Sequence, residues 1–154
     1  TSYQSAPLPA VTSLPPGPYL LIVFAIGIAS NAVAVNVTAL TLDIDDSSTA
    51  TKYDAATDGL LLMRYLLGMR GSALTDDALG ATAQRNATQI EQYIANNLTG
   101  FDVDGDGLTL ATTDGVMILR RLLGITDAAT ITQGAKNSSR SDADVVKAID
   151  ALRP

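Results

Sequence analysis

The chain of 154 residues contains neither cysteine nor histidine. These absences exclude disulfide bonds, zinc sites built on cysteine or histidine, and catalysis by a thiol or an imidazole. Of the sixteen acidic residues, only Glu91 is a glutamate, and the rest are aspartates. Clustered aspartates without these partners are better explained as ligands than as an acid/base pair. The sequence therefore predicts a protein that is not an enzyme.

Positive charge is also scarce, because ten lysines and arginines leave a net charge of −6. Nucleic-acid phosphates need a basic patch, so a nucleic-acid partner is not expected. An aspartate-rich surface is also typical of halophilic proteins, which is an alternative reason for the composition. The length suffices for one domain, or one and a half, with its own core.

Three aspartates at alternate positions are followed by Gly107, in the sequence DVDGDG. Ca²⁺ prefers six to eight oxygen ligands, and alternate residues of a tight loop can point inward together. Glycine at the sixth position permits the sharp turn. This loop is the second of two acidic loops in the chain. Its predicted ligands are Asp102, Asp104, Asp106, the backbone carbonyl of Leu108, and Asp114.

This loop departs from the EF-hand pattern in two ways. Its closing acid is an aspartate at the thirteenth position, and Leu110 stands at the ninth position, where it cannot serve as a ligand. The alternative is a turn rich in aspartate and glycine that merely begins a helix.

An internal repeat supports the calcium interpretation. Residues 57–68 align with residues 113–124, with seven of twelve positions identical. A fixed period indicates one supersecondary unit used twice. The loop before the first copy is three residues longer and lacks the glycine, so we expect two ions with the second loop the tighter. The predicted ligands of the first loop are Asp43, Asp45, Ser47, Asp54 and Asp58.

These loops, each followed by a helix that ends in apolar-Arg-x-Leu-Leu-Gly, resemble the dockerin-type calcium modules of extracellular bacterial and archaeal proteins. The resemblance covers about residues 42–154 and is more specific for the second loop. It implies a Ca²⁺ ion in each loop, two antiparallel helices, an extracellular location and, in many members, docking onto a cohesin domain. The helix positions at which that family reads its partner are apolar here.

No charged residue precedes Asp43. Residues 1–18 carry five prolines, which favour an extended arm. The apolar stretch 19–42 has three interpretations. It could be a signal peptide, although no basic residue precedes it. It could be a membrane helix, although residues 19–35 are shorter than the roughly twenty that a span needs. We favour two β-strands, 19–28 and 32–42, joined at Ser30-Asn31, because valines alternate in the second half.

The predicted fold class is α+β, a two-repeat calcium-loop/helix domain preceded by an uncharged N-terminal β arm or hairpin. The predicted domains are 1–18, 19–42 and 43–154, the last comprising repeats 43–98 and 102–154. Helices are expected over 54–67, 87–97, 113–123 and 141–152. Arg64 and Arg120 are expected to be surface or pairing residues. The core candidates are Leu60, Met63, Leu66, Leu67, Ile90, Tyr93, Ile94, Val145, Val146, Ile149 and Leu152.

Four acceptor sequons for N-linked sugars occur among only six asparagines, which makes extracellular glycosylation plausible. The acceptors are Asn36, Asn86, Asn97 and Asn137.

The predicted function is that of a secreted or cell-surface, calcium-binding structural protein. Apolar strands need cover, and strand addition between copies of the chain would provide it. A head-to-tail contact that does not close produces a filament, so the main expected partner is the chain itself. The alternatives are a docking module for another extracellular domain, such as a cohesin-like one, and a membrane-anchored surface protein.

Overall fold

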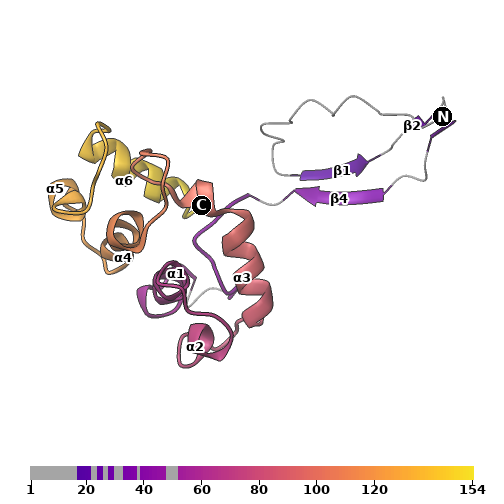
Figure 1. The fold of residues 1–154 in the computed structure, drawn as a ribbon, viewed down its shortest axis with the longest axis horizontal. Coiled ribbons are helices and arrows are strands. Elements are labelled where there is room, and N and C mark those ends of the chain that lie inside the picture. Colours follow the sequence, from indigo (N-terminus) through magenta and orange to yellow (C-terminus); the bar gives the residue numbers. More distant parts are fainter. Residues whose placement is uncertain (1–16, 22–23, 26–27, 30–32, 38, 48–51) are drawn as a thin grey trace. The chain divides into compact units, whose positions relative to one another are not determined.

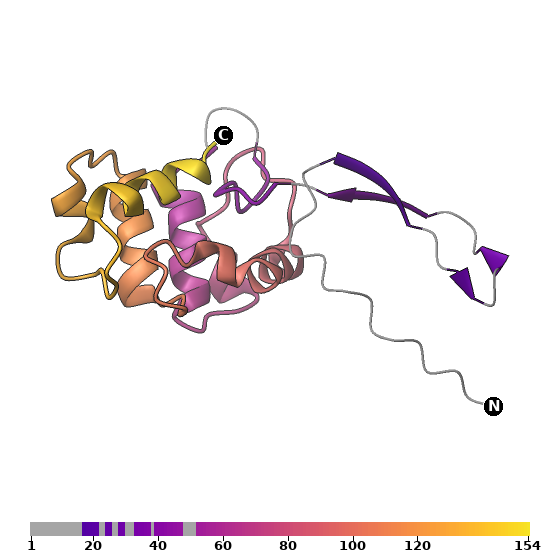
Figure 2. The same cartoon turned by 90° about the horizontal axis from the view of Figure 1, so that it is seen from above.

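The computed structural model describes residues 17–21, 24–25, 28–29, 33–37, 39–47 and 52–154 (Figures 1 and 2). The chain forms two compact units, Thr1–Ala39 and Leu40–Pro154. The boundary between them therefore falls three residues before the expected one at Leu42. The side chain of Leu42 is buried in the core of the second unit, which is why this residue does not belong to the arm. The predicted arm, residues 1–18, lies almost entirely outside the described residues.

The first unit is built from short antiparallel strand pairs (Figure 1). Strand β1 (Gly17–Leu21) pairs with β4 (Val33–Val37), and β2 (Phe24–Ala25) pairs with β3 (Ile28–Ala29). In the second pair, Phe24 is the register partner of Ala29, and Ala25 is the register partner of Ile28. The turn predicted at Ser30-Asn31 lies outside the described residues.

The described part of the apolar stretch forms strands, and β4 ends at Val37 rather than at Leu42. Among the residues that the structure describes, no helix has the length and apolar character needed to cross a membrane. The signal-peptide alternative is not tested by these observations.

The first repeat of the second unit begins with a π-helical turn, η1 (Ala55–Gly59), which continues directly into α1 (Leu60–Leu66). A short helix, α2 (Ser72–Thr75), leads to α3 (Ala87–Asn96). A 3₁₀ turn, η2 (Leu98–Phe101), then enters the second repeat.

The second repeat contains the same elements in the same order. They are the π-helical turn η3 (Ala111–Gly115), α4 (Val116–Leu122), the short helix α5 (Ala128–Thr132), and α6 (Asp142–Ala151). When η1 and η3 are counted with the helices that they begin, the four expected helices lie within two residues of their predicted bounds. The short helices α2 and α5 lie between the expected helices and were not predicted.

Local sequence explains where these helices begin and end. Asn86 and Gln89 form a reciprocal capping box at the start of α3, and the Ser141 side chain accepts from the Asp144 amide at the start of α6. Gly68 and Gly124 follow α1 and α4 with φ angles of 89° and 86°. Glycine adopts these left-handed values without a Cβ clash, so both helices end at the same point of the repeat.

Helices α1 and α4 lie side by side at the centre of the unit, each against the π turn of the other repeat (Figure 2). A Cβ on Gly59 would lie 2.9 Å from Leu119 Cδ1, and a Cβ on Gly115 would lie 2.6 Å from Met63 Sδ. The glycine after each closing aspartate therefore permits the two repeats to approach closely.

The core differs from the expected one in α1. Leu61 and Leu62 are fully buried, whereas Leu67 is 63% exposed and Met63 and Leu66 are half-buried against the other repeat. Helix α1 is apolar on almost every side, so periodicity alone selected the wrong face. The fully buried large side chains are Leu42, Ile44, Leu61, Leu62, Leu74, Ile90, Ile94, Phe101, Met117, Ile118, Ile131 and Ile149.

The repeated arginines pair with backbone carbonyls, which agrees with the role expected for them. Arg64 Nη1 donates to the carbonyls of Leu74 (3.1 Å) and Asp76 (2.6 Å), at the end of α2. Arg120 Nη1 donates to the carbonyls of Ile131 (2.9 Å) and Gln133 (2.8 Å), at the end of α5. Each arginine thus holds the short helix of its own repeat against the first helix.

Candidate cation-binding loops

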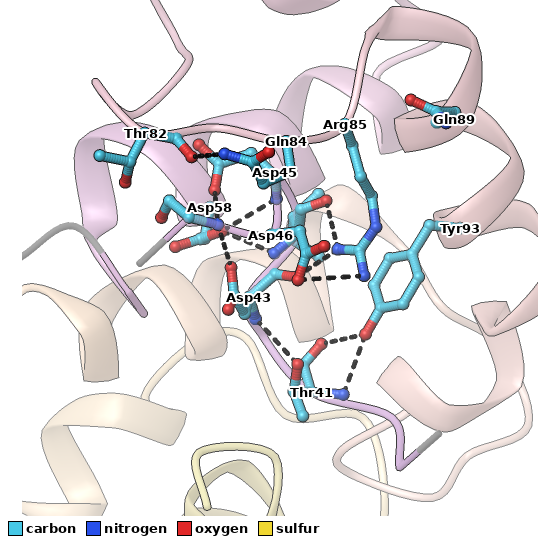
Figure 3. Close-up of polar contacts among 12 residues, drawn as sticks. Thr41, Asp43, Asp45, Asp46, Asp58, Thr82, Gln84, Arg85, Gln89 and Tyr93 are labelled. Atoms are coloured by element: carbon cyan, nitrogen blue, oxygen red, sulfur yellow. Dashed lines mark hydrogen bonds and ion pairs between the residues drawn. The ribbon is translucent and has the colours of Figure 1, made fainter. Parts of the chain in front are cut away.

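The first acidic loop brings together Asp43, Asp45 and Asp58. One carboxylate oxygen from each residue lies within 4.8 Å of the other two. All three residues are buried, at 8%, 0% and 0% exposure. Asp43 and Asp45 come from the extended segment that enters the unit, and Asp58 comes from η1. Figure 3 shows the three side chains pointing toward a common region.

Asp58 is fixed by backbone amides from both sides of the loop. Its Oδ1 accepts from Ile44 N at 2.6 Å and from Asp45 N at 3.4 Å, and its Oδ2 accepts from Asp54 N at 3.1 Å. Burial raises the pKa of Asp58 to about 7, although the hydrogen bond from Ile44 works in the opposite direction. Burial also raises the pKa of Asp43. Burial therefore opposes negative charge at Asp43 and Asp58.

The loop itself closes through its carboxylates. Asp43 Oδ1 and Asp45 Oδ1 both accept from Ser47 N, at 2.9 and 3.0 Å. Asp45 Oδ2 accepts from Gly80 N at 2.6 Å, which ties the loop to the connector that precedes α3. Asp54 has a separate role, because its carboxylate accepts from Ala56 N at 2.6 Å and caps η1. Asp54 is therefore not part of the cluster.

No basic side chain in 39–47 or 52–154 forms an ion pair with the three clustered aspartates. The nearest arginine, Arg85, binds the carbonyl oxygens of the loop and pairs with Asp46 at 3.8 Å. Burying carboxylates without an ion pair is costly, and the backbone amides offset only part of this cost, so a proton or a cation at the cluster would stabilise it further. The all-oxygen donor set and its unbalanced charge fit a hard divalent ion such as Ca²⁺.

The second loop brings together Asp102, Asp104 and Asp106, again with one oxygen of each within 4.8 Å of the others. Asp104 is 1% exposed, and the other two are partly exposed. Asp102 Oδ1 accepts from Gly105 N at 2.7 Å and Oδ2 accepts from Gly107 N at 2.9 Å. Both glycines have left-handed φ angles, 78° and 91°, as a turn of this kind requires.

Asp114 occupies the position equivalent to Asp58 but is not a member of its loop's cluster. The residue is fully buried, and its Oδ1 accepts from Val103 N at 2.9 Å. Its Oδ2 accepts from Leu110 N at 3.1 Å and from the Thr113 hydroxyl at 2.8 Å. Burial raises the pKa of Asp114. The structure thus groups three of the predicted second-loop ligands, Asp102, Asp104 and Asp106. Asp114 lies outside this group and accepts hydrogen bonds from amides of the same loop.

The remaining two predicted ligands have backbone roles in the loops. Leu108 N donates to Asp106 Oδ1 at 2.8 Å, and the Leu108 side chain is 57% exposed. Ser47 is buried at the end of the first loop and supplies the amide described above. Whether the Leu108 carbonyl or the Ser47 side chain binds an ion remains a prediction.

A π-helical turn explains why the closing aspartate of the second loop is one residue late. Gly59 N donates to Asp54 O at 3.1 Å, and Gly115 N donates to Leu110 O at 3.0 Å, each across five residues. Such a turn holds one residue more than an α-helical turn, so it accommodates the extra residue before the aspartate. Each closing aspartate then accepts from the two amides that follow the first residue of its loop.

Asn137 and Ser138, for which the sequence indicated no contact with the cation loops, hold the second loop against the segment that leads into α6. Asn137 N donates to Asp104 Oδ2 at 2.7 Å, and Asn137 Nδ2 donates to Asp106 Oδ2 at 3.0 Å. The Ser138 hydroxyl donates to the Asp104 carbonyl at 2.6 Å. These contacts join positions more than thirty residues apart, and no local pattern could have indicated them.

The sequons differ in how their asparagines are used. Asn97 Nδ2 donates to Tyr93 O at 2.8 Å, and Asn137 Nδ2 serves the second loop as described above. Asn86 is exposed, and its side-chain oxygen caps α3. Asn36 lies in β4, and its side chain is outside the described features. Glycosylation stays a prediction for all four positions.

Each loop offers several carboxylate oxygens, with serine or threonine hydroxyls beside them, at a folded turn. This arrangement suits cation binding more than group transfer. The chain matches no known protein family, no characterised protein and no solved structure at a significant level.

Proposed function

We propose that this chain is a non-enzymatic, calcium-binding structural protein that acts outside the cell. The observation that carries the proposal is the convergence of three buried carboxylates, Asp43, Asp45 and Asp58, with no ion pair among the described residues. The second loop repeats the arrangement with Asp102, Asp104 and Asp106. The resemblance of both loops to dockerin-type calcium modules supports the same conclusion.

In this proposal the six clustered carboxylates hold two Ca²⁺ ions, and the ions supply positive charge that offsets the repulsion among aspartates. The carbonyl of Leu108 and the closing Asp114 complete the second loop. We keep the expectation that the second loop is the tighter, because it carries the glycines and the third aspartate. Since the loops are assembled only in the folded chain, ion binding adds directly to the free energy of unfolding.

The test of ion binding is a comparison of melting temperatures with Ca²⁺ and with a chelator. We expect the chelator to lower the melting temperature, and Asp104→Ala to remove more of the Ca²⁺ effect than Asp46→Ala. Asp77→Asn is the matched control, because Asp77 is exposed and lies outside both clusters. Equal melting of the unaltered protein with and without chelator would sink the assignment.

We also propose that copies of the chain assemble through the N-terminal unit. The described strands of this unit form only two-stranded sheets, and such hairpins are marginally stable alone. Their outer edges have no third strand among the described residues. Strand addition from another copy would supply backbone hydrogen bonds at those edges, and a contact that passes from copy to copy produces a filament.

Deletion of residues 1–39 tests this assembly, because the boundary after Ala39 leaves the second unit intact. Light scattering and negative-stain microscopy should show filaments of the full chain and a monomeric, calcium-binding truncation. Filaments formed by the truncation, or a full chain that stays monomeric without detergent, would contradict it.

A docking role for the second unit is the second candidate. The equivalent residues Leu67 and Leu123 are 63% and 65% exposed, which gives the ends of α1 and α4 matching apolar surfaces. Calorimetric titration against a representative set of cohesin-type domains tests this role. Binding to one of them would favour docking, and silence across the set would leave self-assembly as the better proposal.

A further inference from the structure

Arg85 and Arg140 contact the two cation-binding loops in the same way. Arg85 Nη1 donates to the carbonyl oxygens of Asp43 at 2.7 Å and Ile44 at 3.0 Å. Arg140 Nη1 donates to the carbonyl oxygen of Val103 at 2.6 Å. These carbonyls belong to the first and second residues of the first loop and to the second residue of the second loop. Both guanidinium groups therefore bind the loop where it begins.

Both arginines also occupy the same place in their repeats. Arg85 directly precedes Asn86, the N-cap of α3, and Arg140 directly precedes Ser141, the N-cap of α6. Each arginine therefore connects its loop to the first residue of the helix that ends the repeat. The two positions are not found by the repeat alignment, which covers only residues 57–68 and 113–124.

The turn under each guanidinium is also shared. The fourth loop residue has a left-handed φ in both cases, 58° at Asp46 and 78° at Gly105. A Cβ on Gly105 would lie 2.9 Å from Arg140 Nη2, so the arginine lies directly against this turn. In the first loop, Asp46 replaces the glycine and places Oδ1 3.8 Å from Arg85 Nη2. Aspartate is among the residues that tolerate this backbone region best.

Arg85 is in turn braced by α3 (Figure 3). Its guanidinium lies 4.1 Å from the centre of the Tyr93 ring. The Tyr93 hydroxyl donates to Thr41 O at 2.7 Å and accepts from Thr41 N at 3.0 Å, just before the loop begins. The loop, the arginine and the helix thus form one connected set of contacts.

A second contact reinforces this connection in each repeat. The third loop residue accepts a backbone amide from the connector before the arginine, Asp45 Oδ2 from Gly80 at 2.6 Å and Asp104 Oδ2 from Asn137 at 2.7 Å. A residue that would bind the ion therefore also holds the segment that leads into α3 or α6.

We infer that Arg85 and Arg140 are positioning residues for the cations, which fix the entry of each loop and couple ion binding to the docking of α3 and α6. The inference rests on the proposed calcium binding and adds to it the residues that transmit the ion's effect to the rest of the unit. Coupling of this kind is reciprocal, because an ion that favours the docked helix is itself bound more tightly when that helix is docked.

The direction in which an arginine substitution changes the Ca²⁺ affinity distinguishes a positioning role from a purely electrostatic one. Removing an arginine from the neighbourhood of an ion site removes a repulsive charge, so electrostatics alone predicts tighter Ca²⁺ binding. Loss of a residue that orients the loop predicts weaker binding, by about 10–100-fold for residues that support metal ligands. A residue with a merely structural role would lower the melting temperature without changing the affinity of the folded protein.

The experiment measures Ca²⁺ affinity by calorimetry in the full chain, one loop at a time. Arg140→Gln is made in an Asp45→Asn background, so that only the second loop reports, and Arg85→Gln is made in an Asp104→Asn background. We expect each arginine variant to weaken its own loop by about 10–100-fold. Lysine at either position keeps the charge but lacks the planar fork, so it should restore only part of the affinity.

Arg70→Gln is the matched control. Its guanidinium binds the carbonyls of Tyr65 and Met69, away from both loops, so neither affinity should change. Hydrogen exchange of peptides from α3 and α6 provides the second measurement. Ca²⁺ should slow exchange in both helices of the unaltered chain, and Arg140→Gln should abolish this protection in α6 while leaving it in α3.

Three results overturn the inference. Affinities in the arginine variants equal to or tighter than those of their backgrounds would show that the contacts do not position the loops. Unchanged Ca²⁺-dependent protection of α6 in Arg140→Gln would show that the arginine does not transmit the effect. Absence of any Ca²⁺ binding by the unaltered chain would remove the proposed function and this inference together, whereas the first two results leave calcium binding intact.

Discussion

In the absence of divalent cations, the stability of this protein should fall as the pH rises from about 4.5 to about 7.5. The cause is Asp58, whose pKa burial raises from 3.8 to about 7 in the folded chain. Between these two pH values the folded state keeps a proton that the unfolded state has released. The contribution of Asp58 to the free energy of unfolding is therefore complete below about pH 4 and decreases with pH across this window.

The size of the effect follows from the shift. About three pH units at about 1.4 kcal/mol each give an upper limit of about 4 kcal/mol for Asp58. For a unit of this length that corresponds to a fall in melting temperature on the order of 15 °C. Asp43 and Asp114, whose pKa values burial also raises, contribute with the same sign. Asp127 and Asp142 have lowered pKa values, so their contribution is lost only as the pH falls through the acid range below about 4.

Calcium should reverse this dependence. An ion at the cluster stabilises the charged carboxylates, and protons compete with it, so stability in excess Ca²⁺ should rise with pH through the same window. The assay is thermal unfolding followed by circular dichroism from pH 4.5 to 8, in parallel series with chelator and with Ca²⁺. The difference in melting temperature between the Ca²⁺ series and the chelator series should be smallest at low pH and should increase as the pH rises.

Asp58→Asn provides the decisive variant, because it stays neutral at every pH. In chelator it should lose most of the slope, and in Ca²⁺ it should lose most of the stabilisation at pH 7.5. Asp77→Asn is the control, because Asp77 is exposed and asparagine tolerates its φ of 56°. A chelated protein whose stability is flat or rises between pH 4.5 and 7.5 would refute the reasoning.

Three further predictions concern packing and caps. Gly115→Ala should lower the free energy of unfolding by about 1–3 kcal/mol in urea titrations, because its Cβ would lie 2.6 Å from Met63 Sδ; an unchanged midpoint would mean that the repeats can separate freely. Phe101→Ala should cost about 3–5 kcal/mol by the same measurement, since Phe101 is fully buried where the repeats join, and a cost below 1 kcal/mol would contradict that placement. Asn86→Ala should cost about 1 kcal/mol through loss of the capping box of α3, and Asn86→Asp, which keeps the acceptor, should cost less; equal costs would argue against the cap.

The sequence anticipated those parts of the molecule in which the physical rule is local. The helix bounds followed from capping residues and glycines, such as Asn86, Ser141, Gly68 and Gly124, because each acts within one turn of itself. The clustering of Asp102, Asp104 and Asp106 followed from their alternate spacing for the same reason. In the first loop, the pairing of Asp43 with Asp45 and Asp58 followed from the repeat.

What the sequence missed depends on contacts between distant segments. Periodicity placed Leu67 in the core, but a helix that is apolar all round gives no signal for which face meets the other repeat. The π turns were not predicted. From the sequence, the extra residue before Asp114 is only a departure from the EF-hand spacing, and the hydrogen bond from Gly115 N to Leu110 O that accommodates it is known only from the structure. The cap that Asp54 places on η1 was also not predicted, and the role of Asp54 as a ligand stays a prediction. Arg85 and Arg140 were overlooked because their partners lie more than thirty-five residues away.

The entry of the chain into the second unit also has a mechanical consequence. The Leu42 amide donates to the Leu152 carbonyl at 2.7 Å, and the Leu42 side chain is 1% exposed in the core. Asp43 is the next residue. If copies are joined through the N-terminal unit, tension on a filament reaches the second unit at this point, and Leu42 bears the load before Asp43 does. In such a filament, the Leu42–Leu152 hydrogen bond would have to break, and the Leu42 side chain would have to leave the core, before tension could distort the first cation-binding loop.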